Sequence, residues 1–358
     1  MQGFELVKDI TVSATSKIVL LVIDGLGGLP DPATGKTELE TALTPNLDRL
    51  AASSSCGLSQ PVGPGITPGS GPAHLALFGY DPLKYAIGRG VLEALGVDFD
   101  LKPGDVAARG NFCTVDENEL ITDRRAGRIS TEDSAALCQL LDGLDIDGIK
   151  VIVRPVKEHR FILVLRGEGL DYRITDTDPQ RLGVAPLAAE ALSPQARRTA
   201  DTINAFVSQA RAILAGHHPA NMLLLRGFSE HPSFPAFGDV YKLKAAAIAS
   251  YPMYRGLAKV VGMSVLATGP KLGDEMMTLE QNYAAYDFFF MHVKGADAAG
   301  EDGDFMRKVG VIEEVDLAIP QILKLEPDVL VVAGDHATPA LIKGHSWHDV
   351  PCLIYSKW

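Results

Sequence analysis

Residues 328–336 read Asp-Val-Leu-Val-Val-Ala-Gly-Asp-His, and this stretch decides the fold prediction. Its apolar run, rich in β-branched residues, predicts a buried parallel strand that stops at Gly334. Asp335 and His336 follow side by side. Carboxylates and imidazoles are common ligands of zinc and manganese, and sites in open α/β sheets form beyond the carboxyl ends of strands. We therefore expect a metal site here, with a simple turn cap as the alternative.

Similar apolar runs occur near both ends of the chain, at 17–24 and 285–293. Residues 304–324 predict an amphipathic helix that Pro320 should kink or end early. Alternating strands and helices predict a doubly wound α/β domain. Further predicted elements, strands at 106–115, 150–154 and 160–166 and a helical segment at 193–214, lie in the middle of the chain.

The middle of the chain breaks the alternation and predicts an insertion. If the terminal strands share one sheet, the middle must form a separate α+β domain. We place the α/β domain at residues 1–86 and 218–358 and the inserted domain at 87–217. The apolar run at Asn221 (NMLLLRG) is expected to resume the α/β pattern.

Composition narrows the classes of partner. The 358 residues carry a net charge of −12, which argues against nucleic acid as a partner but allows a local basic site for a small anion. The four cysteines are scattered, as in proteins of the reducing cytoplasm. No apolar run is long enough to span a membrane, and residues 1–16 lack a signal-peptide layout. We expect a cytoplasmic protein with no membrane partner.

Acidic and histidine side chains follow several of the predicted strands. These candidate metal ligands are Asp24, Asp297, Glu301, Asp335, His336 and His345. Two neighbouring divalent ions need about six to eight such ligands. Any single acid could instead be a helix cap or a solvated charge, but that explanation does not account for their shared position at strand ends.

Ser70 is the candidate nucleophile. It lies in Thr-Pro-Gly-Ser-Gly-Pro-Ala-His (67–74), a Gly-rich turn that enters a predicted helix. Backbone N–H groups at a helix N-terminus stabilise anions, and metal coordination activates a hydroxyl. A plain N-cap serine is the alternative. His74, one turn later, is expected to be a core residue.

Basic residues concentrate in the middle of the chain. Arg124, Arg125 and Arg128 fall within five positions, and His159-Arg160 begins a predicted strand. Guanidinium groups bind phosphate and carboxylate in bidentate fashion. In an acidic chain this cluster predicts a small anionic, phosphorylated substrate, with a solvated basic face as the alternative. Arg255 opens a further predicted helix.

Taken together, these motifs resemble the cofactor-independent phosphoglycerate mutases of the archaeal type, in the alkaline phosphatase superfamily. The resemblance covers nearly the whole chain. It is carried by LLVIDGLGGLP, TPNLDRLA, PGSGPAHLALFGYDP, GRGVLEALG, LKPGDVAARGNF, DRRAGRI, ITDTDP, HVKGADAAGEDGD and GDHATP.

The resemblance implies an alkaline-phosphatase-like doubly wound sheet domain with an inserted smaller α+β domain. It also implies a glycolytic isomerase that interconverts 3-phosphoglycerate and 2-phosphoglycerate through phosphorylated Ser70, without 2,3-bisphosphoglycerate. One divalent ion would be held by Asp24, Ser70, Asp335 and His336, and the other by Asp297, position 301 and His345. Substrate would contact Asn111, Arg124, Arg125, Arg128, His159, Arg160, Arg255 and Lys294.

The chain departs from the family pattern at position 301, where the family usually has histidine and this chain has Glu301. A carboxylate is a harder ligand than imidazole and shifts preference from zinc toward manganese or magnesium. We therefore predict manganese, with Mg2+, Co2+ or Zn2+ as alternatives. His348 could take the vacant ligand place instead of Glu301. Gly71 and Pro72 also replace the acidic residue usual beside the nucleophile.

Two other functions remain open. The same site could transfer phosphate to another small hydroxyl compound, such as homoserine, or hydrolyse phosphomonoesters. The chain could also be a non-catalytic metal-binding protein, although the retained Ser70 argues against this. The sequence predicts no oligomeric state.

Overall fold

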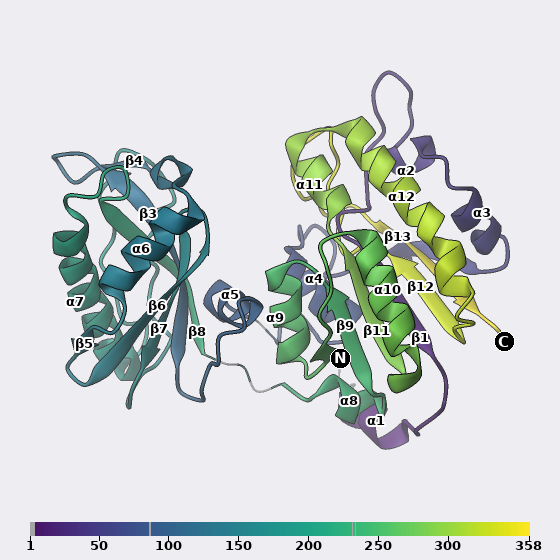
Figure 1. The fold of residues 1–358 in the computed structure, drawn as a ribbon, viewed down its shortest axis with the longest axis horizontal. Coiled ribbons are helices and arrows are strands. Elements are labelled where there is room, and N and C mark those ends of the chain that lie inside the picture. The colour runs from purple at the N-terminus through teal and green to yellow at the C-terminus, as the bar shows by residue number, and fades with distance from the viewer. Residues whose placement is uncertain (1–3, 86, 231, 233) are drawn as a thin grey trace. The chain divides into compact units, whose positions relative to one another are not determined.

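The computed structural model describes residues 4–85, 87–230, 232 and 234–358 (Figure 1). The chain forms two compact units, which we call unit 1 (Met1–Ala86 with Phe234–Trp358) and unit 2 (Ile87–Ser233). Unit 2 begins where we predicted the insertion to begin, next to residue 86, which lies outside the described residues.

The predicted end of the insertion at residue 217 is wrong. Strand β8 (Met222–Glu230), which we expected to resume the α/β pattern, pairs antiparallel with β3 (Val106–Val115) inside unit 2. An apolar run predicts a strand but does not reveal the sheet that the strand will join. The boundary therefore lies after β8, at Ser233.

Unit 1 contains a seven-stranded sheet in the order β10-β9-β11-β1-β12-β13-β2. The strands are β1 (Ile18–Ile23), β2 (Ser55–Ser59), β9 (Ala245–Ala249), β10 (Ser264–Val265), β11 (Phe288–Val293), β12 (Val329–Ala333) and β13 (Val350–Ser356). The first five strands in this order are parallel, and β13 pairs antiparallel with β12 and β2. The central strand β1 therefore has parallel neighbours on both sides.

Helices cover both faces of this sheet. The helices of unit 1 are α1 (Phe4–Ile10), α2 (Glu38–Thr41), α3 (Pro45–Ala51), α4 (Ser70–Leu77), α8 (Phe237–Tyr241), α9 (Pro252–Val260), α10 (Leu272–Asn282), α11 (Gly295–Asp302) and α12 (Phe305–Leu323), with a 3-10 turn at Tyr283–Ala285. Phe289 of β11 packs in one core with α10 and α12. Its neighbour Phe290 points to the opposite face and meets Phe78 and His74 of the α4 region. The two-faced packing matches the predicted doubly wound domain.

Pro320 does not end α12 early, because the helix continues to Leu323. A proline removes the hydrogen bond to the carbonyl four residues earlier. Here that carbonyl belongs to Asp316, and it accepts a hydrogen bond from Asn46 Nδ2 at 3.3 Å. The proline also lies in the last turn of α12, so the helix loses little stability.

Unit 2 is an antiparallel sheet with helices, in agreement with the predicted α+β insertion. Its strands are β3, β4 (Ile121–Asp123), β5 (Asp145–Ile146), β6 (Ile149–Lys157), β7 (Arg160–Arg166) and β8, and its helices are α5 (Arg89–Gly96), α6 (Thr131–Leu141) and α7 (Arg197–Leu214), with 3-10 turns at Ala126–Arg128 and Pro194–Ala196. Phe112 and Phe161 point into a core shared with α6 and α7. Alternation therefore sends Arg109, Asn111 and Arg160 to the opposite face.

No helix in the described part of the chain combines the length and the hydropathy needed to cross a membrane.

Candidate metal centre and anion-binding pocket

The candidate metal ligands of unit 1 meet because three parallel strands end together. Strands β1 and β12 are hydrogen-bonded neighbours, and Asp24 and Asp335 follow their last residues. Strand β11 lies on the other side of β1, and Asp297 occupies the first turn of α11 just beyond it. Parallel strands bring their carboxyl ends to one edge, so residues far apart in sequence share one site.

Asp24, Asp335 and His336 form the first cluster, and their ligand atoms lie within 4.8 Å of one another. His336 Nε2 is 3.3 Å from Asp24 Oδ1 and 3.2 Å from Asp335 Oδ2. Both carboxylate oxygens are buried and lack hydrogen-bond partners. Unpartnered buried anionic oxygens are costly. Two of them beside an imidazole therefore fit a divalent cation.

Asp297, His336 and His345 form the second cluster. His345 Nε2 lies 3.3 Å from Asp297 Oδ1 and 3.8 Å from Glu301 Oε1. The Glu301 side chain is 56% exposed and lies outside both clusters. His348 Nδ1 is 2.8 Å from Ser346 Oγ, and its ring stacks on Trp347. Among the described residues, His336 therefore belongs to both clusters. The role of Glu301 as a metal ligand remains a prediction.

Ser70 begins α4, and Gly69 rather than Ser70 occupies the N-cap position. The Ser70 Oγ atom lies 3.2 Å from His336 Nε2, which places the hydroxyl at the first cluster. His74 is fully buried, as expected for a core residue, but its Nδ1 is 2.8 Å from the Ser70 carbonyl and 3.3 Å from Asp335 Oδ2. The core histidine therefore also supports the site.

The electrostatics of the clusters favour a bound cation. Burial, followed by the charge of Asp24, raises the pKa of Asp335 well above its ordinary value. Burial opposes ionisation of Asp24, but a hydrogen bond from His292 and the charges of His292 and Lys294 hold its pKa well below the usual range. Burial lowers the pKa of His336 to about 4, so its imidazole is neutral and suited to a ligand. One carboxylate is thus stabilised as an anion while its neighbour is not.

Lys294, predicted to contact substrate, lies between two carboxylates. Its Nζ donates to Asp24 Oδ2 at 3.0 Å and to Asp297 Oδ2. Sequence reasoning missed Thr338, whose hydroxyl donates to Asp297 Oδ1 at 2.6 Å and lies 3.0 Å from His336 Nδ1. No local signal in the sequence distinguished Thr338 from an ordinary loop threonine.

Sequence reasoning also missed His292 and Tyr254. His292 Nε2 lies 3.1 Å from Asp24 Oδ2, and the Tyr254 hydroxyl donates to the same oxygen. Period-two alternation could have placed His292 on the face of β11 that leads to the site. No local signal distinguished Tyr254 from a core aromatic residue.

A cavity of about 520 Å3 in unit 2 gathers most of the predicted substrate contacts. It is lined by Arg109, Asn111, Arg124, Arg125, Arg128, Lys157, Glu158, His159, Arg160, Gln180 and Arg226. Asn111 and His159 are buried, and Asn111 Oδ1 and His159 Nδ1 have no hydrogen-bond partner. Seven cationic side chains against one lining carboxylate make this basic pocket suitable for a small anion. Arg255 belongs to α9 of unit 1 and is not part of it.

Asp178, which is buried, and Glu93, which is partly buried, contact arginines of the basic pocket. Asp178 accepts a bidentate pair from Arg124, with Nε at 3.1 Å and Nη2 at 2.6 Å. Glu93 of α5 lies 3.2 Å from Arg109 Nε. Arg109 and Arg226 escaped sequence reasoning because each stands alone on its strand, whereas 124–128 form a visible cluster.

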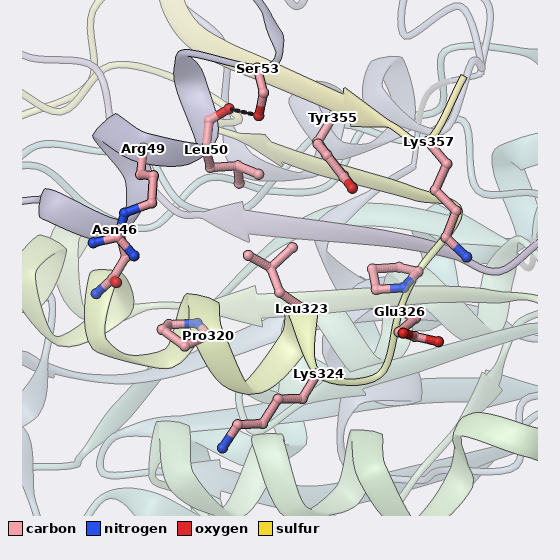
Figure 2. Close-up of a pocket in the computed structure, with 11 residues that line it drawn as sticks. Asn46, Arg49, Leu50, Ser53, Pro320, Leu323, Lys324, Glu326, Tyr355 and Lys357 are labelled. Carbon is pink, nitrogen blue, oxygen red and sulfur yellow. Dashed lines mark hydrogen bonds between the residues drawn. The ribbon is translucent and has the colours of Figure 1, made fainter.

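A larger cavity, of about 720 Å3, lies at the other end of β12 and contains neither cluster (Figure 2). Figure 2 shows Leu50 and Leu323 facing it, with Arg49, Lys324 and Lys357 around it. No histidine is among its lining residues, and Lys357 is paired with Asp328 at 3.2 Å. The candidate metal ligands and the substrate-binding arginines therefore lie outside this larger cavity.

The chain is similar to known proteins over most of its length. The model of the 2,3-bisphosphoglycerate-independent phosphoglycerate mutase family matches residues 51–221. A probable 2,3-bisphosphoglycerate-independent phosphoglycerate mutase of Thermotoga maritima is 51% identical over 99% of this chain and 88% of its own length. A protein of the same description from Thermus thermophilus is 51% identical over 100% of this chain and 89% of its own.

Two solved structures share the fold. A protein from Pyrococcus horikoshii superposes with a TM-score of 0.81 at 31% identity, covering 95% of this chain and 87% of that one. The cofactor-independent phosphoglycerate mutase from Thermoplasma acidophilum gives a TM-score of 0.72 at 31% identity, covering 95% of this chain and 90% of its own.

Proposed function

Because this chain belongs to the 2,3-bisphosphoglycerate-independent phosphoglycerate mutase family, we propose that it interconverts 3-phosphoglycerate and 2-phosphoglycerate through a phosphoserine at Ser70. The observation that carries the proposal is the contact of Ser70 Oγ with His336 Nε2 at 3.2 Å, beside the unpartnered oxygens of Asp24 and Asp335. A nucleophile beside a cation-binding cluster is the arrangement that phosphoryl transfer requires.

The donor atoms fit two divalent cations. Asp24, Ser70, Asp335 and His336 would hold one ion, and Asp297 with His345 the other, joined by Glu301 or His348. Bound cations would neutralise phosphate charge and lower the pKa of the Ser70 hydroxyl. The carboxylate-rich donor set favours manganese. No bisphosphoglycerate is needed, because Ser70 itself carries the phosphoryl group between substrate hydroxyls.

The reaction consists of two substitutions at phosphorus. Ser70 Oγ gives up its proton and forms a bond to phosphorus while the bond from phosphorus to the substrate hydroxyl oxygen breaks, and that oxygen takes up a proton. The glycerate then turns, and its other hydroxyl loses a proton and takes the phosphoryl group as the bond from Ser70 Oγ to phosphorus breaks and Oγ takes up a proton. Lys294 is suited to stabilise the negative charge of the phosphoryl group during both steps, since its ammonium already lies beside Asp24 and Asp297 in the site.

The basic pocket of unit 2 supports a phosphorylated carboxylic acid as the substrate. We assign its Asn111, Arg124, Arg125, Arg128, His159 and Arg160 to anion binding, and Arg255 of unit 1 as a further substrate contact. The bidentate Asp178–Arg124 pair holds one guanidinium in place before substrate arrives, which lowers the entropy cost of binding.

The test is turnover of 3-phosphoglycerate coupled to enolase, with manganese added and bisphosphoglycerate absent. We expect activity in the wild type and a loss of about four orders of magnitude or more in Ser70→Ala. Brief incubation with substrate should yield a peptide phosphorylated on Ser70. Absence of turnover, with release of inorganic phosphate or transfer to homoserine instead, would overturn the mutase assignment while keeping the site.

A further inference from the structure

The two carboxylate oxygens of Asp24 have different surroundings. Oδ1 is buried, has no hydrogen-bond partner and faces His336 Nε2 at 3.3 Å. Oδ2 is surrounded by the Tyr254 hydroxyl, His292 Nε2 at 3.1 Å and Lys294 Nζ at 3.0 Å. One oxygen is therefore free to bind a cation, and the other is already held by the protein.

Packing fixes the Tyr254 ring beside Asp24. Tyr254 lies in α9 and is fully buried. Its ring stacks on that of His292, with centroids 3.5 Å apart and an interplanar angle of 25°. His292 of β11 pairs in register with Val22 of β1, two residues before Asp24. Since side chains two residues apart share a face, the sheet itself carries Asp24 and this ring pair to the same place.

The Tyr254 hydroxyl also contacts Lys294. It donates to Asp24 Oδ2 and accepts a hydrogen bond from Lys294 Nζ at 3.3 Å. A phenol has a single hydrogen, which goes to Asp24, so the Lys294 ammonium is the donor in the other bond.

We propose that Tyr254 is a positioning residue of the active site, which holds Asp24 by Oδ2. Held in this way, Asp24 presents Oδ1 to the cation. Groups that orient a metal ligand typically contribute ten- to a hundredfold to metal affinity or activity when they are removed. The role in turnover rests on the proposed mutase function, whereas the role in cation binding does not.

Tyr254→Phe tests the proposal, because the ring and its stacking on His292 remain and only the hydroxyl is lost. The matched control is Tyr251→Phe, which removes a hydroxyl from an exposed residue of the same segment. The first readout is titration of metal-free protein with cobalt(II), followed by its visible absorption. The second is kcat and KM for 3-phosphoglycerate, and thermal melting checks the fold.

We expect Tyr254→Phe to bind cobalt(II) about tenfold or more weakly, and to lose about tenfold to a hundredfold in kcat with KM within about twofold. Tyr251→Phe should match the wild type in both readouts. Wild-type cobalt(II) affinity in Tyr254→Phe overturns the proposal, as does wild-type kcat. If the wild type does not turn over 3-phosphoglycerate, the mutase function fails, and the cobalt(II) titration still decides the role of Tyr254 at Asp24.

Discussion

A buried lysine of α12 is expected to stabilise both loops that carry the metal ligands of the first cluster. Lys308 has no exposed surface, and its Nζ donates to the carbonyls of Gly27 and Thr338, each at 2.9 Å. It lies 3.6 Å from the buried carboxylate of Glu38, which in turn accepts from the backbone N–H of Ala340. Lysine is almost never fully buried unless it is paired. Lys308 therefore connects the loop after β1 to the loop after β12.

The perturbation is Lys308→Met, which keeps the length of the side chain and removes the charge. It leaves the Glu38 carboxylate buried without a cation and two carbonyls without a donor. Breaking a buried ion pair in this way costs about 3–5 kcal/mol. For a folding unit the size of unit 1, that loss corresponds to a melting temperature lower by about 6–20 °C.

The assay is thermal unfolding of metal-free protein, followed by circular dichroism. Lys324→Met is the matched control, because Lys324 is an exposed residue at the end of the same helix and should shift stability by less than about 0.5 kcal/mol. The double variant Lys308→Met with Glu38→Gln should be more stable than Lys308→Met alone, since the unpaired charge is gone while the acceptor for Ala340 remains. A melting point of Lys308→Met within about 2 °C of the wild type would refute the reasoning.

Three further predictions concern the ligand at position 301, the basic pocket and a buried acid. Glu301→Ala should lose one of two bound manganese ions in metal analysis while His348→Ala keeps both, and the reverse result would give the ligand place to His348. Arg128→Ala should raise KM for 3-phosphoglycerate about tenfold or more with metal content unchanged. Loss of metal would contradict the assignment of Arg128 to substrate binding. Burial raises the pKa of Glu275 to about 8 in the folded state, against about 4.5 in the unfolded state. Between these two pH values the folded state binds one more proton than the unfolded state, so the protein loses stability as pH rises across this range. Glu275→Gln should therefore melt near the wild type at pH 5 but be more stable at pH 8, by at most about 5 kcal/mol; equal curves at both pH values would contradict this.

Local patterns were sufficient to predict the strands that lead into the site. An apolar run ending in an acid predicted both β1 with Asp24 and β12 with Asp335, because a buried parallel strand must be apolar along its whole length. The cluster at 124–128 predicted an anion site because its positive charges are neighbours in the chain. Features of this kind depend only on adjacent residues, so they are visible without tertiary structure.

Other features depend on contacts between distant segments. Strand β8 reads like a strand of the α/β sheet, yet it pairs with β3 of unit 2, because strand pairing is decided by the partner's edge and not by the apolar run itself.

The site depends both on local sequence patterns and on contacts between distant segments. The sequence by itself determined which strand ends carry Asp24, Asp335 and His336 and that Ser70 begins a helix. Only the tertiary structure decided which oxygen of Asp24 is free, since its other oxygen is held by Tyr254, 230 residues away, and by His292, 268 residues away. The physical reason is that hydrophobic periodicity encodes the burial of a segment, whereas the direction of a buried polar atom is set by the hydrogen-bond partners that folding brings to it.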